Sequence, residues 1–315
     1  MSTLLEASNL YRHYSDHCAV NDVSITLNAG DILGLLGPNG AGKTTTMNLL
    51  SGNLAPSAGS VLIKGIDLQE TPKLAKRNIG YLPEQPPLYK DLRVDEYLRY
   101  CGLLKGIKRK AVTAALQRAK QRTGLADTGQ RLIGNLSKGY QQRVGIAQAI
   151  IHEPDLIILD EPTVGLDPIQ IREIRGLIQE LGQQHGIILS THILPEVQAV
   201  CNRIHIMHRG RIAYDDASAQ DGSRQALRVS FARPADPRLL KALAGIRALE
   251  KSTDRRYLIS CDDSKALAPR LAALAVEQGW DLLEMTPETV GLEQIFINLT
   301  QGEQHDDIDK NEQAA

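Results

Sequence analysis

The residues with the clearest chemistry lie near the start of the chain, in a glycine-rich segment that ends in lysine and threonine. Residues 37–44 match the phosphate-binding pattern G-x-x-x-x-G-K-[ST]. In such a loop the backbone N–H groups surround an anion, and the helix that follows presents its positive end to it. The segment predicts a site for a nucleoside triphosphate with Mg²⁺. The expected contacts are Gly37, Pro38, Asn39, Gly40, Ala41, Gly42, Lys43, Thr44 and Thr45.

Two side chains of this loop have specific expected roles. Lys43 would place its charge beside the β- and γ-phosphates, and the Thr44 hydroxyl would bind Mg²⁺. Such loops occur in kinases, GTPases and ATPase motors, so the loop fixes the ligand class but not the reaction. A chance glycine-rich turn is the alternative. The strand-like run 31–36 before the loop and the helical pattern 44–50 after it argue against that alternative.

A second group of polar residues follows an apolar run later in the chain. Residues 156–159 predict a buried strand that ends in Asp160 and Glu161. In a phosphate-loop protein an acid at such a strand tip can hold Mg²⁺, and we assign Asp160 to this role. Glu161 would project to the other side, and we assign it to orienting or deprotonating the attacking water. A strand that merely ends in two acids before the turn at Pro162 is the alternative.

Strand-like and helical segments alternate around these motifs. This order suggests βαβ units and an α/β fold with a mostly parallel core sheet. From about 91 to 136 apolar residues recur at helical spacing instead, which predicts a helical insertion. The strand-like runs are 4–8, 23–27, 31–36, 61–63, 79–82, 156–159, 187–190, 204–207 and 211–214, and further helical runs are 169–181 and 193–200.

A second, smaller α+β domain is predicted toward the end of the chain. The polar segment 215–224 predicts a linker, so we expect domains over 1–216 and 225–300. The second domain has a βαββαβ order, which is that of the ferredoxin-like arrangement. Its strand-like runs are 227–231, 247–251, 257–261 and 280–285, its helical runs are 237–244 and 265–278, an amphipathic helix at 290–299 closes it, and a disordered acidic tail is expected at 301–315.

Composition restricts the function classes. The chain has 315 residues, 42% hydrophobic and 23% charged, which is typical of about two globular domains. A net charge of −1 argues against nucleic acid as a partner. The four scattered cysteines predict reduced thiols in a cytosolic protein. The sequence shows neither a signal peptide nor a run of the ~18–20 apolar residues that a bilayer helix needs, so any membrane contact would pass through a partner.

The order of six separated motifs resembles the ATP-binding subunit of an ABC transporter. After the phosphate loop come Gln85 behind a strand, Leu-Ser-Lys-Gly at 136–139, the strand ending in Asp-Glu at 160–161, Gly-Leu-Asp at 165–167 and Ser-Thr-His at 190–192. The resemblance covers about residues 3–215. It implies a P-loop ATPase of the ABC type with an antiparallel β subdomain beside the core sheet, and with ATP and Mg²⁺ as cofactors.

The resemblance implies roles for two residues near the γ-phosphate. Gln85 would contact Mg²⁺ or the attacking water, as the glutamine of this family's glutamine loop does. A surface glutamine before the turn at 86–87 is the alternative. His192 would hydrogen-bond the γ-phosphate and help to position the water.

The resemblance also implies that two copies form a head-to-tail dimer around two ATP molecules. Ser137 and Gly139 would then contact the ATP held by the other copy, and Asp167 would communicate between the two sites. The chain departs from the commonest family pattern at Lys138 and Tyr140, where Gly and Gln are usual. An N-cap of the following helix is the alternative role for Ser137, and both roles are compatible.

An aromatic residue is expected to stack on the adenine. Tyr14 is our choice and Tyr11 is the competitor, while plain packing is the alternative for either ring.

The function implied by the resemblance is that of a transport motor. ATP closes the dimer, hydrolysis lets it open, and a separate membrane permease converts this cycle into substrate movement. The protein would be peripheral, at the cytoplasmic face of the inner membrane, and the helical insertion would dock the permease. The run 292–296 resembles the ending of exporter-type, ABC-2-like subunits with a C-terminal accessory domain. The candidate docking residues are Tyr89, Leu92, Tyr97 and Tyr100, although core packing explains most of them equally well.

Two other functions are weighed against this one. A soluble ABC-type ATPase acting on ribosomes or nucleic acid is disfavoured, because the chain has a single phosphate loop and no basic run. A nucleotide sensor that does not hydrolyse ATP is disfavoured, because residues for Mg²⁺ binding and for water activation are both present.

Overall fold

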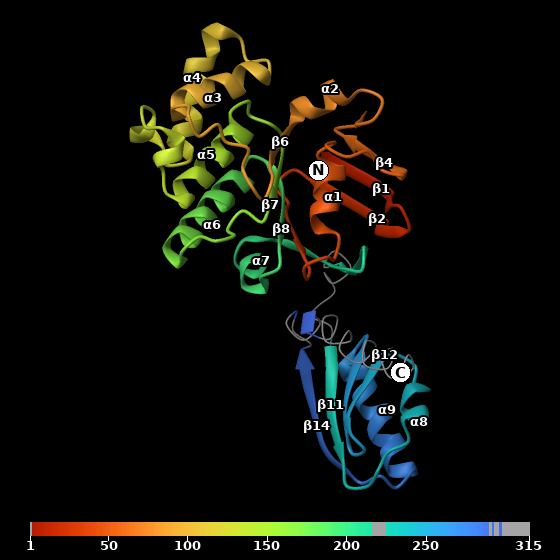
Figure 1. Cartoon of the computed structure of the whole chain (residues 1–315). Coiled ribbons are helices and arrows are strands. Elements are labelled where there is room, and N and C mark those ends of the chain that lie inside the picture. Colours follow the sequence, from red (N-terminus) through yellow and green to blue (C-terminus); the bar gives the residue numbers. More distant parts are fainter. Residues whose placement is uncertain (1, 216–224, 290–291, 293–295, 298–315) are drawn as a thin grey trace, which may run out of the picture. The chain divides into compact units, whose positions relative to one another are not determined.

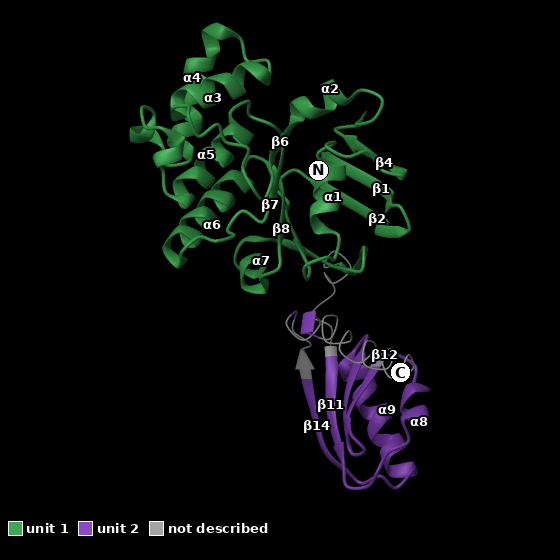
Figure 2. Cartoon of the chain, viewed as in Figure 1, with its two compact units in different colours: residues 1–215 green, residues 216–315 purple. Residues whose placement is uncertain are grey.

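The computed structural model of the chain describes residues 2–215, 225–289, 292 and 296–297. It forms two compact units, residues 1–215 and 216–315, which Figures 1 and 2 show. Asp215, expected at the start of the linker, is instead the last residue of a strand in the first unit. The rest of the predicted linker, most of the helix expected at 290–299 and the tail at 301–315 lie outside the described residues.

A six-stranded sheet forms the core of the first unit, in the order β10-β9-β3-β8-β7-β6. Neighbouring strands are parallel except β10, which runs antiparallel to β9. Strands β3, β7 and β8 are wholly buried, which explains their nearly unbroken apolar sequences. The predicted parallel core sheet is therefore confirmed. The bounds are β3 Ile32–Leu36, β6 Ile79–Leu82, β7 Leu156–Asp160, β8 Gly186–Thr191, β9 Arg203–His208 and β10 Arg211–Asp215.

A four-stranded antiparallel sheet is the second layer of this unit, in the order β2-β1-β4-β5. Strands β1 and β2 are each 12 residues long, more than twice the length expected from the sequence. Buried and exposed side chains alternate along β2, as in a strand with one face on the core. Tyr14 is the last residue of β1 and lies next to the turn of this long hairpin. The bounds are β1 Thr3–Tyr14, β2 His17–Asn28, β4 Ala58–Ile63 and β5 Ile66–Asp67.

Helices surround the core sheet of the first unit (Figure 1). The predicted helical insertion contains α3 and α4, which bury apolar residues at helical spacing and pack on each other. Two short 3₁₀ turns, Ala126–Thr128 and Ile133–Asn135, complete it. None of the described helices is long and apolar enough to span a membrane. The bounds are α1 Lys43–Leu50, α2 Pro72–Ala75, α3 Val94–Leu104, α4 Arg109–Arg122, α5 Lys138–Ile150, α6 Pro168–Gly182 and α7 Leu194–Val200.

The second unit has its own sheet and its own core. The sheet order β12-β13-β11-β14, with every neighbouring pair antiparallel, is the order of a ferredoxin-like fold. The predicted βαββαβ arrangement is thus confirmed. The rings of Phe231, Tyr257 and Trp280 meet in the core, with centroids of Phe231 and Trp280 5.5 Å apart. The bounds are β11 Gln225–Phe231, α8 Pro237–Lys241, β12 Ile246–Thr253, β13 Arg256–Cys261, α9 Ser264–Glu277 and β14 Leu282–Thr289.

A half-buried histidine just after α5 makes the stability of the first unit depend on pH. His152 Nε2 lies 3.0 Å from the carbonyl oxygen of Ile79. Burial, aided by the charge of Lys105, lowers the pKa of His152 from 6.5 to about 4. The native state thus keeps this imidazole neutral, whereas the unfolded chain protonates it near pH 6.5. The stability is complete above that pH and is lost as the pH falls toward 4.

We expect His152→Gln to flatten this pH dependence, since the amide nitrogen can replace Nε2 without titrating. In wild type, His152 removes about 2 kcal/mol of unfolding free energy between pH 7 and pH 5. Urea unfolding at both pH values measures it. His13→Gln, at an exposed position, is the matched control and should retain the wild-type dependence. An equal change in unfolding free energy between pH 7 and pH 5 in the two variants would contradict the prediction.

Candidate active site

The order of strands in the core sheet brings the predicted motifs together. Strand β8 lies between β3 and β7, and the three are parallel, so their carboxyl ends meet at one edge of the sheet. Leu36 at the end of β3 lies opposite Thr191, and Asp160 at the end of β7 lies opposite Ser190. Each strand leads directly into one of the motifs. The phosphate loop, the paired acids and His192 therefore lie side by side.

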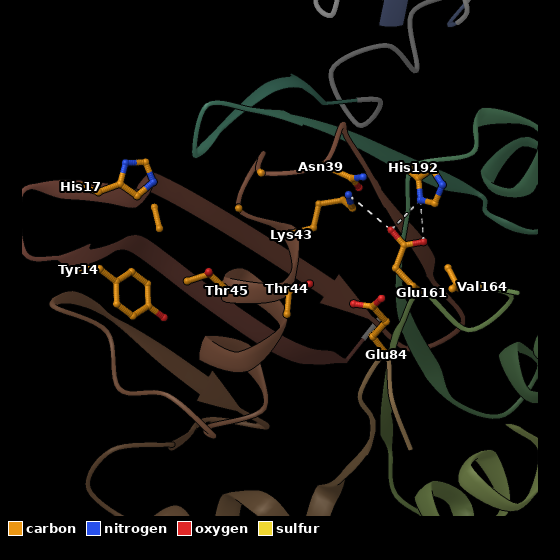
Figure 3. Close-up of a pocket in the computed structure, with 13 residues that line it drawn as sticks. Tyr14, His17, Asn39, Lys43, Thr44, Thr45, Glu84, Glu161, Val164 and His192 are labelled. Carbon is orange, nitrogen blue, oxygen red and sulfur yellow. Dashed lines mark hydrogen bonds and ion pairs between the residues drawn. The ribbon is translucent and has the colours of Figure 1, made fainter. Parts of the chain in front are cut away.

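A cavity of about 480 Å³ opens at this edge (Figure 3). Most of the loop residues line it, and so do Glu161 and His192, two of the residues predicted to act on the attacking water. Gly37, Pro38 and Ala41 belong to the loop but do not line the cavity. The lining residues are Tyr14, His17, Ala19, Asn39, Gly40, Gly42, Lys43, Thr44, Thr45, Glu84, Glu161, Val164 and His192.

A lysine, a carboxylate and an imidazole converge at one end of this cavity (Figure 3). Lys43 is only 6% exposed, and its Nζ donates to the carbonyl oxygens of Gly37 at 2.8 Å and Pro38 at 3.1 Å. The same Nζ lies 3.5 Å from Glu161 Oε1. Each carboxylate oxygen of Glu161 lies 3.1 Å from His192 Nδ1. A cation, a base and a hydrogen-bonding ring thus contact one another beside the phosphate loop.

The two acids at the end of β7 have separate partners. Asp160 is fully buried, and its Oδ1 accepts hydrogen bonds from Ser190 Oγ at 2.5 Å and from Thr44 Oγ1 at 3.5 Å. Glu161 has a left-handed backbone with φ 46°, and its side chain meets Lys43 and His192 instead. Burial raises the pKa of Asp160, hydrogen bonds from Ser190 and Thr44 oppose this shift, and the charge of Glu161 adds to it.

The residues around Asp160 fit a hard divalent cation. Asp160 Oδ2 is buried and accepts no hydrogen bond in the part of the chain that the structure describes. The Thr44 hydroxyl lies beside the other oxygen of this carboxylate. Carboxylate and hydroxyl oxygens are ligands that Mg²⁺ accepts, usually together with water and substrate phosphates. The described residues contain no group of three or more His, Cys, Asp or Glu that could hold a metal. A metal held there would therefore need further ligands from water or from the nucleotide.

Gln85, expected at this site, does not line the cavity. Its neighbour Glu84 does, and the charge of Glu84 also raises the pKa of Asp160. Both residues follow β6, whose last residue Leu82 pairs with Leu159 of β7. The chain bends at residues 84 and 85, and of the two side chains only that of Glu84 reaches the cavity wall. The family resemblance pointed to Gln85 and not to Glu84, and the role of either residue stays a prediction.

Ser137, Gly139 and Asp167 also lie outside the cavity of their own chain. Ser137 Oγ accepts from the backbone N–H of Tyr140 at 3.5 Å and caps α5. Asp167 Oδ1 accepts from two backbone N–H groups, at 3.0 and 2.9 Å, and caps α6. The capping role considered for Ser137 is therefore present. Contact of these residues with the ATP of a second copy stays a prediction.

Of the two tyrosines considered for adenine, only Tyr14 lines the cavity. Its ring is 46% exposed and lies at the end of the long β1–β2 hairpin. Tyr11 is stacked on His13, with ring centroids 6.5 Å apart. The position of the two rings favours Tyr14.

Comparison with known proteins decides the family. Residues 20–164 match the model of the ABC transporter family. The chain is 34% identical over 308 residues to the bacitracin transport ATP-binding protein BcrA of Bacillus licheniformis, covering 96% of this chain and 99% of that protein. The chain belongs to the ABC transporter ATP-binding family. It is also 40% identical over 201 residues to the ABC transporter ATP-binding protein NatA of Bacillus subtilis, covering 63% of this chain and 82% of NatA.

The fold of the first unit agrees with this assignment. A solved ATP-binding subunit of an ABC transporter is 33% identical to the chain, with a TM-score of 0.62, and the match covers 67% of this chain and 89% of that subunit. This protein is therefore an ATP-binding and ATP-hydrolysing subunit of an ABC transporter. This assignment disfavours the alternative of a sensor that only binds nucleotide.

The phosphate loop of this ABC ATPase depends on close contact between backbones. Gly42 has φ 102°, and a Cβ at this position would lie 2.5 Å from the carbonyl oxygen of Ala19. Gly40 also has a left-handed backbone, with φ 80°, but a Cβ there would meet nothing within 4 Å. The two glycines thus differ in steric contact and share the backbone conformation.

We expect Gly42→Ala to lower nucleotide affinity at least about tenfold, equal to about 1.4 kcal/mol, because the loop must move away from Ala19. Gly65→Ala is the matched control, because Gly65 lies outside the cavity, has φ 77° and would have nothing within 4 Å of its Cβ, so it carries only the left-handed backbone cost of about 1–2 kcal/mol in folding stability. Equilibrium binding of a fluorescent ATP analogue and urea unfolding measure the two effects. Equal nucleotide affinities in both variants would contradict the steric argument.

Proposed function

We propose that this chain drives a separate membrane permease by hydrolysing ATP in the cavity beside the phosphate loop, as one half of a dimer. The observation that carries the proposal is the contact of Lys43, Glu161 and His192 at one end of this cavity. The chain would act at the cytoplasmic face of the inner membrane, as a peripheral subunit of an exporter.

The contacts suggest how the chain's residues act on the γ-phosphate. A bound triphosphate would compete with Glu161 for Lys43, because both are anions next to one ammonium group. The freed carboxylate would accept a proton from water as the water oxygen attacks the γ-phosphorus. The bond from the γ-phosphorus to the bridging oxygen breaks, and ADP leaves with that electron pair. His192 would donate from Nδ1 to Glu161, and with both ring nitrogens protonated it would also donate a hydrogen bond from Nε2 to the γ-phosphate.

Mg²⁺ would be held by Thr44 and Asp160, with Glu84 in the place first expected for Gln85. The partnerless Oδ2 of Asp160 and the position of Glu84 in the cavity wall support this set. Bound Mg²⁺ supplies positive charge that neutralises the phosphate oxygens. Tyr14 would stack on the adenine at the other end of the cavity, where its exposed ring lines the wall.

The dimer is proposed from residues that stay outside their own cavity. Ser137 and Gly139 lie at the amino-terminal end of α5, a 13-residue helix whose dipole favours an anion at that end. In a head-to-tail pair, this end would face the γ-phosphate held by the other copy. Asp167, which caps α6, would lie between the two sites.

The permease is proposed to dock beside the segment that carries Glu84. A second cavity of about 270 Å³ lies there, and Pro83 and Pro87 from this segment are among its lining residues. Of the predicted docking residues, Tyr97 is 3% exposed and belongs to the core. Tyr89 and Tyr100 are 55% and 44% exposed and are available for contact.

Export is proposed from the type of relative that the whole chain matches. The similarity to BcrA, which is named for bacitracin transport, spans both units of this chain. This supports the C-terminal unit as an accessory domain of the same transporter type. The net charge of −1 gives no support to ribosomes or nucleic acid as the partner.

Glu161→Gln tests the proposed reaction, because the amide keeps the shape of the side chain but cannot accept the proton. We expect this variant to bind ATP, to lose at least about a hundredfold in turnover and to accumulate as an ATP-bound dimer. ATPase assays and light scattering with and without ATP measure this. Normal turnover would contradict the role of Glu161. A species that stays monomeric with ATP and the permease present would contradict the dimer.

Glu84→Ala and Gln85→Ala form a matched pair that tests the proposed assignment of Glu84. We expect Glu84→Ala to raise the Mg²⁺ concentration needed for half-maximal ATPase activity about tenfold, whereas Gln85→Ala retains the wild-type value. Titration of the ATPase activity with Mg²⁺ measures both. The reverse result would return the role to Gln85.

A further inference from the structure

A buried carboxylate joins the two loops that carry Glu161 and His192. Glu196 lies on α7 and is only 4% exposed. Both its oxygens lie 2.8 Å from Thr163 Oγ1, and Oε2 also accepts from Thr191 Oγ1 at 2.8 Å. Thr163 follows Glu161 by two residues, and Thr191 directly precedes His192. One side chain outside the cavity therefore contacts both segments of the catalytic pair.

The hydrogen bonds fix the direction of each hydroxyl. Thr191 Oγ1 accepts from the backbone N–H of Ile193 at 3.1 Å, so its own hydrogen is left to donate to Glu196. The Thr163 hydroxyl likewise donates to the carboxylate. Both donors need an acceptor, and an ionised carboxylate supplies only acceptors. A glutamine would present one N–H group to a hydroxyl that is already arranged to donate.

Neutral groups supply most of what compensates this buried charge. The ammonium of Lys43 contacts Glu161 and not Glu196, and Arg175 Nη2 of α6 lies 4.0 Å from Glu196 Oε1. A buried carboxylate has a substantial desolvation cost that only well-placed hydrogen bonds offset. Apolar side chains in place of Glu196, Thr163 and Thr191 would avoid this desolvation cost, so the carboxylate has a value beyond packing.

We propose that Glu196 is a positioning residue, which sets the distance between Glu161 and His192 by holding Thr163 and Thr191 together. The inference rests on the proposed function, in which Glu161 accepts the proton from water and His192 orients Glu161. Rate depends steeply on such placement, and a misplacement of about 1 Å can cost about a hundredfold. Nucleotide binding depends instead on the phosphate loop and on Tyr14, which Glu196 does not contact.

The test compares ATPase kinetics of the full-length chain with and without the hydrogen bonds to Glu196. We expect Glu196→Gln and Thr163→Val each to lower kcat at least about tenfold, with KM for ATP and the affinity for a fluorescent ATP analogue within about twofold of wild type. The kcat of the double variant should fall no further than that of the worse single variant, because both substitutions break the same hydrogen-bonded contact. Thr163→Ser keeps the hydroxyl and should retain wild-type kcat.

Glu180→Gln, at an exposed position of α6, is the matched control for the loss of a carboxylate and should retain wild-type kcat. If Glu196→Gln does not fold by circular dichroism, the comparison of Thr163→Val with Thr163→Ser decides alone. Unchanged kcat in Thr163→Val, an equal loss in Thr163→Ser, or a rise in KM in place of a fall in kcat would overturn the positioning role. Absence of hydrolysis by wild type with its permease would instead contradict the proposed function.

Discussion

The site depends on one constraint, the position of β8 between the strand that leads into the phosphate loop and the strand that ends in the acids. Ser190 of β8 contacts both acids. Its hydroxyl donates to Asp160 at 2.5 Å and accepts from the backbone N–H of Glu161 at 2.9 Å. A residue of β8 thereby fixes both acids of β7. The next residues of β8 and its loop place His192 against Glu161. Any other strand order would separate these groups, however well each motif matched its pattern.

Three charged side chains are buried at this edge of the sheet, where desolvation costs free energy. Lys43 and Glu161 form a pair whose side chains are 6% and 8% exposed, and Asp160 is fully buried beside them. A buried pair of this kind adds little net stability, but removal of one partner costs about 3–5 kcal/mol because the other charge is left uncompensated. The raised pKa of Asp160 reports the same cost. The arrangement is therefore better explained by nucleotide chemistry than by folding stability.

The sequence predicts those parts of the fold and the site that depend on the pattern of neighbouring residues along the chain. Strands β3, β7 and β8 were predictable because both faces are buried, and the second unit because its pattern alternates between strand and helix periods. The length of the β1–β2 hairpin, the short elements β5 and α2, and the position of Glu84 in the cavity wall were missed. Each depends on register or tertiary contact. The Glu196 contacts with Thr163, 33 residues away along the chain, belong to the same class.

The charges around the cavity of one chain give a reason for the proposed pairing of two copies. The cavity and its edge bring Glu84, Asp160 and Glu161 close to the place where a highly charged triphosphate would lie. Lys43, the phosphate-loop N–H groups and the end of α1 supply the positive potential from the same chain. Bound Mg²⁺ would offset part of the remaining repulsion. The amino-terminal end of α5 from a second copy would offset more, and only while the γ-phosphate is present. Loss of that phosphate would remove the group that both copies share, so hydrolysis would weaken the proposed pair without any change in the rest of the interface.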